Sequence, residues 1–132
     1  MRPHRSPLAR ILLVDDEPDI LHTLAQGLPL FLNSVELDVA ANGHEARQRL
    51  EKTTYDILIT DQKMPGMAGL ELVEWVRQRA PRTRCVLMTA YAGGPLREAA
   101  KGAGVDLYLE KPFDFRHLAK AVQPLLPATS PA

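Results

Sequence analysis

Five short apolar runs alternate with segments of helical periodicity along most of the chain. The runs cover residues 11–14, 35–40, 56–60, 85–89 and 105–109. Three of them, ILLV, DILIT and CVLMT, are apolar at almost every position, which is typical of parallel strands covered on both faces. A strand followed by a helix, repeated five times, predicts an α/β doubly wound domain.

Two of the expected helices have a well-marked apolar stripe. The stripe of the first consists of Ile20, Leu21, Leu24, Ala25 and Leu28, and that of the last of Phe115, Leu118, Ala119, Val122 and Leu126. Pro29 comes directly after the first stripe. Because proline lacks the N–H that a helix interior needs, we expect it to kink or end this helix.

The length of 132 residues fits a single domain. We expect the folded body to span residues 9–126. Residues 1–8, MRPHRSPL, have no periodicity and are expected to form a flexible arm. Residues 127–132, PATSPA, are expected to form a flexible tail or the start of a linker.

Composition and charge exclude several classes of protein. The single cysteine, Cys85, rules out an intramolecular disulfide and hence a disulfide-built secreted scaffold. Sixteen Lys and Arg balance sixteen Asp and Glu, so no global charge favours binding to nucleic acid or to a membrane surface. No signal peptide is apparent, and no stretch approaches the roughly 20 apolar residues of a membrane helix. We therefore expect a cytoplasmic protein.

Residues that can carry chemistry stand at the ends of four of the apolar runs. They are Asp15 and Asp16 after the first run, Asp61 after the third, Thr89 at the end of the fourth and Lys111 after the fifth. Ligands of open α/β sheets bind outside the carboxyl ends of the strands. We therefore expect three carboxylates, a hydroxyl and an ammonium group to converge at one edge of the sheet.

This set of side chains indicates phosphoryl chemistry around a metal ion. Three neighbouring carboxylates repel one another, and oxygen ligands without histidine or cysteine favour Mg²⁺, with Mn²⁺ as an alternative. A carboxylate can act as a nucleophile and form an aspartyl-phosphate, for which the cation and Lys111 would supply positive charge. Asp61 is the better nucleophile candidate, because the loop after it, QKMPG, favours a fixed turn. The adjacent Asp15 and Asp16 suit metal ligands.

Four motifs occur in an order and with a spacing similar to those of a known protein family: ILLVDDEPDI (11–20), ILITDQKMPGMAGLEL (57–72), VLMTAYA (86–92) and YLEKPF (108–113). With these motifs the chain resembles, over residues 9–126, the receiver domain of bacterial two-component response regulators. The resemblance implies a doubly wound, five-stranded parallel sheet of flavodoxin-like order 2-1-3-4-5 with helices on both faces.

The resemblance also implies the roles of the metal and phosphoacceptor residues. Asp61 matches the phosphoacceptor. Asp16 matches a direct Mg²⁺ ligand, and Asp15 one that acts largely through water. The backbone carbonyl of Lys63 would complete the metal site.

Further positions match residues that respond to the phosphoryl group in this family. Thr89 matches the switch hydroxyl that moves toward that group, and Tyr108 the aromatic side chain whose rotamer changes with it. Lys111 matches the lysine that pairs with the phosphate. The resemblance implies a cis bond between Lys111 and Pro112.

The chain departs from the family pattern at a few positions. Ala68 stands where family members often carry Asp, a natural helix N-cap, so the stability of the following helix is in question. Pro29 is uncommon within the first helix and would alter the docking face for a kinase. Lys63 and Tyr91 occupy variable positions that tune how fast the phosphoryl group is hydrolysed.

The function that follows is a phosphorylation-controlled switch in a two-component phosphorelay. A histidine kinase or phosphotransfer protein would donate the phosphoryl group, and Asp61 would accept it with Mg²⁺ bound. The domain would catalyse its own phosphorylation and slow dephosphorylation and would not be a turnover enzyme. The face of the fourth helix, fifth strand and fifth helix would contact an output partner or form a phosphorylation-dependent homodimer. No direct binding to nucleic acid or membrane is expected.

Three other functions fit the same fold. A phosphatase with an Asp nucleophile usually places two acids one residue apart after the first strand, whereas here they are adjacent. A pseudo-receiver would use the fold without being phosphorylated. A flavin-binding domain would need a phosphate-cradling loop after the first strand, where this chain has DDEPD. The sequence does not identify the kinase, the stimulus or the output target.

Overall fold

A five-stranded parallel sheet forms the centre of the computed structural model, which describes residues 8–90 and 93–127. The strand order is β2-β1-β3-β4-β5, which confirms the expected order 2-1-3-4-5. The strands are β1 (Ala9–Val14), β2 (Val35–Ala40), β3 (Ile57–Asp61), β4 (Arg84–Thr89) and β5 (Leu107–Glu110). All neighbouring pairs are parallel, so the carboxyl ends of the strands meet at one edge.

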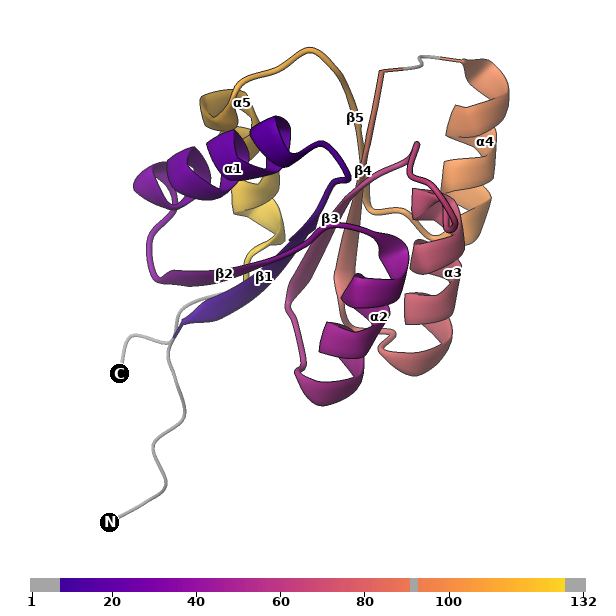
Figure 1. Ribbon diagram of the computed structural model, residues 1–132, viewed down its shortest axis with the longest axis horizontal. Coiled ribbons are helices and arrows are strands. Elements are labelled where there is room, and N and C mark those ends of the chain that lie inside the picture. Colours follow the sequence, from indigo (N-terminus) through magenta and orange to yellow (C-terminus); the bar gives the residue numbers. More distant parts are fainter. Residues whose placement is uncertain (1–7, 91–92, 128–132) are drawn as a thin grey trace.

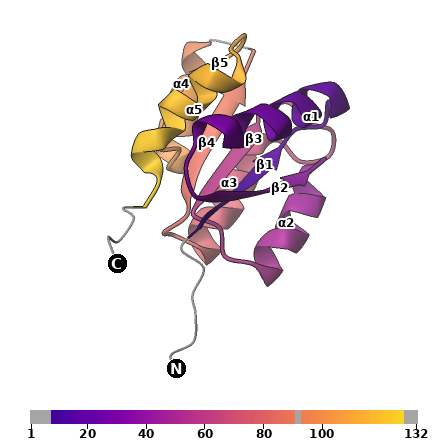
Figure 2. The same ribbon diagram turned by 90° about the vertical axis from the view of Figure 1, so that its left-hand side faces the viewer.

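Five α-helices cover both faces of the sheet. They are α1 (Pro18–Gly27), α2 (Gly43–Lys52), α3 (Gly69–Arg79), α4 (Gly94–Ala103) and α5 (Phe115–Val122), and short 3-10 turns follow α1 (Leu28–Phe31) and α5 (Gln123–Leu125). Figure 1 shows α1 and α5 on one face and α2, α3 and α4 on the other, and Figure 2 shows the same layers after a quarter turn. The doubly wound α/β prediction is confirmed.

The sheet divides the interior into two hydrophobic cores. Alternate residues of β1 point to opposite faces, so Ile11 and Leu13 pack with α1 and α5, whereas Leu12 and Val14 pack with α2 and α3. All four side chains are completely buried. Burial on both faces explains why the runs ILLV and CVLMT are apolar at almost every position.

The helix and strand boundaries expected from the sequence differ only slightly from those in the structure. Pro29 ends α1, as predicted, since the helix stops at Gly27 and Pro29 lies in the 3-10 turn that follows. The comparison with the family pattern had placed Pro29 within the first helix, and that placement is wrong. The fifth strand begins at Leu107 rather than at residue 105. The reason is that Val105 donates its N–H to Ala100 of α4 and belongs to the end of that helix.

The expected arm and tail, residues 1–8 and 127–132, lie outside the described residues except for Leu8 and Pro127. Within residues 8–90 and 93–127, every helix is too short or too polar to cross a membrane.

Candidate functional site

Three aspartates lie together at the carboxyl edge of the sheet. Asp15 follows β1 and is completely buried, Asp16 beside it is half-buried, and the buried Asp61 ends β3. One carboxylate oxygen from each lies within 4.8 Å of the other two. Asp15 is fixed because its N–H donates to the Ala40 carbonyl at 3.2 Å and its Oδ1 accepts from the Glu17 N–H at 3.0 Å. The three carboxylates therefore converge, as predicted from the strand ends.

Lys111 brings a positive charge to this cluster. Its Nζ lies 3.1 Å from Asp61 Oδ1 and 3.4 Å from Asp15 Oδ2. The backbone holds it there, because the Lys111 N–H donates to the Thr89 carbonyl at 2.7 Å and so ties the end of β5 to the end of β4. The bond between Lys111 and Pro112 is cis, as the resemblance implied.

The electrostatics of the cluster favour binding of a further cation. Burial raises the pKa of Asp61, and the neighbouring Asp15 and Asp16 raise it further, although Lys111 acts in the opposite direction. For Lys111, burial on its own would lower the pKa, but the carboxylates of Asp61 and Asp15 outweigh it and raise the pKa. Three carboxylates therefore exceed what one ammonium group neutralises, and the donor set is one that hard divalent cations prefer.

The loop after Asp61 is fixed by contacts that sequence reasoning missed. Gln62 donates its N–H to the Met88 carbonyl and accepts the Gly69 N–H, both at 2.9 Å. Its side-chain Oε1 accepts the N–H of Leu70, in the first turn of α3, at 2.8 Å. Gln62 thus supplies the cap that Ala68 cannot. The sequence had left the stability of α3 in question because Ala68 cannot cap it, and the hydrogen bond from Leu70 to Gln62 compensates for the missing cap.

Gly69, at the start of α3, lies against the backbone of the phosphoacceptor candidate. A Cβ at this position would come within 2.4 Å of the Asp61 carbonyl oxygen. Only glycine permits this approach of the helix end to Asp61. Lys63 lies on the exposed part of the same loop, two residues after Asp61, and the role of its carbonyl stays a prediction.

The two expected switch residues lie on neighbouring strands. Thr89 is buried at the end of β4, one residue beyond the position that pairs with Asp61. Tyr108 is half-buried on β5, where it pairs with Leu87. Tyr91, expected to tune the lifetime of the phosphoryl group, lies outside the described residues. Sequence reasoning also missed Arg97 of α4, whose guanidinium carbon lies 4.7 Å from the centre of the Tyr108 ring.

Comparison with known proteins decides the family. The sequence model of the response regulator receiver domain family matches residues 11–123, which is most of the chain and includes every expected site residue. The chain belongs to the response regulator receiver family. It is thus a receiver domain of a two-component phosphorelay.

Two curated relatives illustrate the range of proteins that contain this domain. The receiver domain is 36% identical over 124 residues to the response regulator protein PilR of Pseudomonas aeruginosa, which covers 92% of this chain and 27% of PilR. It is 31% identical to sporulation initiation phosphotransferase F of Bacillus subtilis over 92% of this chain and 96% of that protein. The chain spans between a quarter and about half of the length of the first curated relatives, with shares of 27, 43, 50 and 51%.

Solved structures have the same fold over nearly their whole length. A CheY-like receiver domain from Methanospirillum hungatei is 31% identical, with a TM-score of 0.82 over 89% of this chain and 92% of that one. The response regulator TrrA of Thermotoga maritima, solved in complex with Mg²⁺ and BeF, is 35% identical, with a TM-score of 0.79 over 90% of this chain and 100% of that one.

Proposed function

We propose that this receiver domain accepts a phosphoryl group on Asp61 with Mg²⁺ bound, and that the modification switches its output surface. The observation that carries the proposal is the meeting of Asp15, Asp16, Asp61 and Lys111 at one edge of the sheet. Most of the groups that phosphoryl transfer requires come from this chain, so it acts on itself and does not turn over a substrate.

The residues of the edge fit a magnesium ion. Asp15, Asp16 and Asp61 offer oxygen ligands, and Lys63 lies on the loop that would contribute a carbonyl. When bound, Mg²⁺ would supply positive charge to the phosphoryl oxygens, and Mn²⁺ would serve in the same place. Burial, and to a smaller extent the neighbouring Asp15 and Asp16, raise the pKa of Asp61, and a cation bound at this edge would stabilise its ionised form.

Asp61 would act as the nucleophile. One of its carboxylate oxygens attacks the phosphorus of a phosphohistidine, the new O–P bond forms, and the N–P bond breaks with its electron pair returning to the imidazole nitrogen. Lys111 Nζ, now 3.1 Å from Asp61 Oδ1, is close enough to pair with the transferred group. The Thr89 hydroxyl would donate a hydrogen bond to it. The acyl phosphate carries a charge of about −1.5 to −2, which provides the driving force for these movements.

The donor, a histidine kinase or a phosphotransfer protein, would dock beside Lys111. A largely apolar cavity of about 440 Å³ lies there, lined by Ile20 and Leu24 of α1 and by Phe113 and Phe115 after β5. The Phe115 ring also contacts that of Phe31, which is exposed in the turn after α1; the ring centres are 5.6 Å apart and the planes are tilted by 32°. The apolar surface thus runs from the reacting edge to the turn that Pro29 creates.

The output surface would be formed by α4, β5 and α5, which respond to Thr89 and Tyr108. It would contact an output partner or a second phosphorylated copy, with no direct contact to nucleic acid or membrane. Residues 9–126 would form the switching unit, in the cytoplasm.

Intact mass spectrometry after incubation with acetyl phosphate tests the proposal. With Mg²⁺, the wild type should gain the mass of one labile phosphoryl group, and the gain should disappear when EDTA removes the metal. Asp61→Asn should gain nothing. Asp19→Asn makes the same chemical change outside the carboxylate cluster and should be modified like the wild type. A wild type that stays unmodified with Mg²⁺ would favour a pseudo-receiver.

A further inference from the structure

A single arginine of α4 contacts the strand that carries the expected switch tyrosine. The Arg97 guanidinium carbon lies 4.7 Å from the centre of the Tyr108 ring, and its Nη2 donates to Glu110 Oε1 at 2.8 Å. Tyr108 and Glu110 are two residues apart on β5, so their side chains share one face of the strand. One guanidinium can therefore contact both.

These contacts lie directly beside the reacting groups. Glu110 pairs with Thr89 across the β4–β5 ladder, and the next residue is Lys111, whose Nζ contacts Asp61. Thr89 and Lys111 are the residues that would be drawn to a phosphoryl group. A side chain that holds Glu110 and Tyr108 therefore acts on the strand that must respond.

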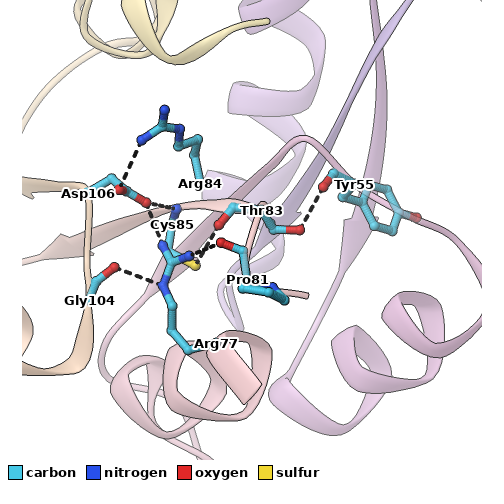
Figure 3. Close-up of polar contacts among 8 residues, drawn as sticks. All are labelled: Tyr55, Arg77, Pro81, Thr83, Arg84, Cys85, Gly104 and Asp106. Atoms are coloured by element: carbon cyan, nitrogen blue, oxygen red, sulfur yellow. Dashed lines mark hydrogen bonds and ion pairs between the residues drawn. The ribbon is translucent and has the colours of Figure 1, made fainter. Parts of the chain in front are cut away.

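The opposite end of α4 is fixed independently. Arg77 of α3 donates from Nε to the Gly104 carbonyl at 3.0 Å, just after α4 ends, and its Nη2 pairs with Asp106 at 2.6 Å (Figure 3). Asp106 is held in turn by the Cys85 N–H at 2.7 Å. These contacts hold α4 at its carboxyl end and do not involve its amino-terminal half. Arg97 lies in that half.

We propose that Arg97 is a positioning residue that holds Tyr108 and Glu110 in their unphosphorylated arrangement and so sets how readily the domain switches. The inference rests on the proposed function, since it requires Tyr108 to move. A contact made in one of two states shifts the equilibrium toward that state. Arg97 and Glu110 are well exposed, with side-chain accessibilities of 59% and 44%, so the contact is weak enough to bias the switch without locking it.

Fluorotyrosine NMR combined with beryllofluoride titration tests the proposal. The chain has three tyrosines, and Tyr108→Phe assigns the Tyr108 resonance. With Mg²⁺, beryllofluoride mimics the phosphoryl group and should shift this resonance in the wild type. In Arg97→Gln the unliganded resonance should lie part-way toward the saturated position. The beryllofluoride concentration for half-saturation should fall about fivefold, from the loss of a cation–π contact and an exposed ion pair.

Three further variants separate positioning from a general effect on stability. Arg97→Lys keeps the charge and should largely restore wild-type behaviour. Glu110→Gln should give part of the effect in the wild-type background and little in Arg97→Gln. Lys101→Gln removes a positive charge from the exposed end of the same helix and should change neither readout. Simple destabilisation would not increase the affinity for beryllofluoride.

Two results would overturn the inference, and they differ in meaning. If beryllofluoride shifts Tyr108 in the wild type but Arg97→Gln has wild-type resonance and affinity, the role of Arg97 is wrong and the proposed switch stands. If the Tyr108 resonance of the wild type does not respond to saturating beryllofluoride, the tyrosine switch is wrong and the role of Arg97 falls with it.

Discussion

Exchanging the cap of α3 provides a sharp test of how the loop after Asp61 is held. Gln62→Ala removes the side-chain oxygen that accepts the Leu70 N–H at 2.8 Å, and nothing in the side chain of Ala68 can replace it. Loss of a helix cap costs about 1 kcal/mol, within a range of roughly 0.5–2 kcal/mol. For a domain of this size, that should lower Tm by about 4 °C.

Ala68→Asp should restore what Gln62→Ala removes. An Asp at this position would accept the N–H of Leu70 or Glu71, and Glu71 already accepts the Ala68 N–H at 3.0 Å, so the two would complete a capping box. In the wild type the Leu70 N–H is already bonded, so Ala68→Asp should stabilise less there than in the Gln62→Ala background. The double variant should therefore be more stable than the sum of the two single effects on the free energy of unfolding predicts.

Urea unfolding in metal-free buffer measures all four proteins of this cycle, with an unchanged m-value as the criterion for two-state behaviour. Gln78→Ala, on the exposed surface of α3, is the matched control and should be nearly neutral. If Gln62→Ala is as stable as the control, or the two substitutions add without coupling, the capping role of Gln62 is refuted.

Two further predictions concern charge. Burial raises the folded-state pKa of Asp61 above its ordinary 3.8, so the metal-free fold loses stability as the pH rises through that raised pKa. Asp61→Asn should therefore be more stable than the wild type at neutral pH, and urea titrations should show this advantage shrinking toward pH 3.8. An advantage that stays constant with pH would contradict the argument. Arg77→Ala should lower the free energy of unfolding in urea by about 2 kcal/mol, because three hydrogen bonds from the guanidinium are lost. Arg84→Ala removes only an exposed ion pair with Asp106, 3.5 Å long, and should lower it by less than about 0.5 kcal/mol. Equal losses of stability in the two variants would show that the Arg77 contacts do not matter.

The strands and the site could be predicted because both depend on local patterns. A run such as ILLV is buried on both faces, which leaves few structures other than a central parallel strand. Once the strands are parallel, the residues after β1, β3 and β5 must meet at one edge. This topology brings Lys111 to the same edge as Asp15, 96 residues earlier in the chain.

The contacts that were not predicted depend on side-chain geometry between elements. Gln62 caps a helix residue eight positions later, while the usual signal, a polar residue at Ala68, is absent. Arg97 reaches Tyr108 only because α4 lies beside β5, and nothing in the spacing of the sequence reveals that distance. Val105 was included in the fifth apolar run, yet its N–H donates to the Ala100 carbonyl at the end of α4.

The division of the interior by the sheet has a consequence for how such a domain can diversify. Substitutions in the layer of α1 and α5 contact one set of core side chains, and those in the layer of α2 and α3 contact another. Changes in the two layers should therefore combine almost independently in their effect on stability. A new partner can be accommodated by redesigning one side of the molecule while the packing on the other is left untouched.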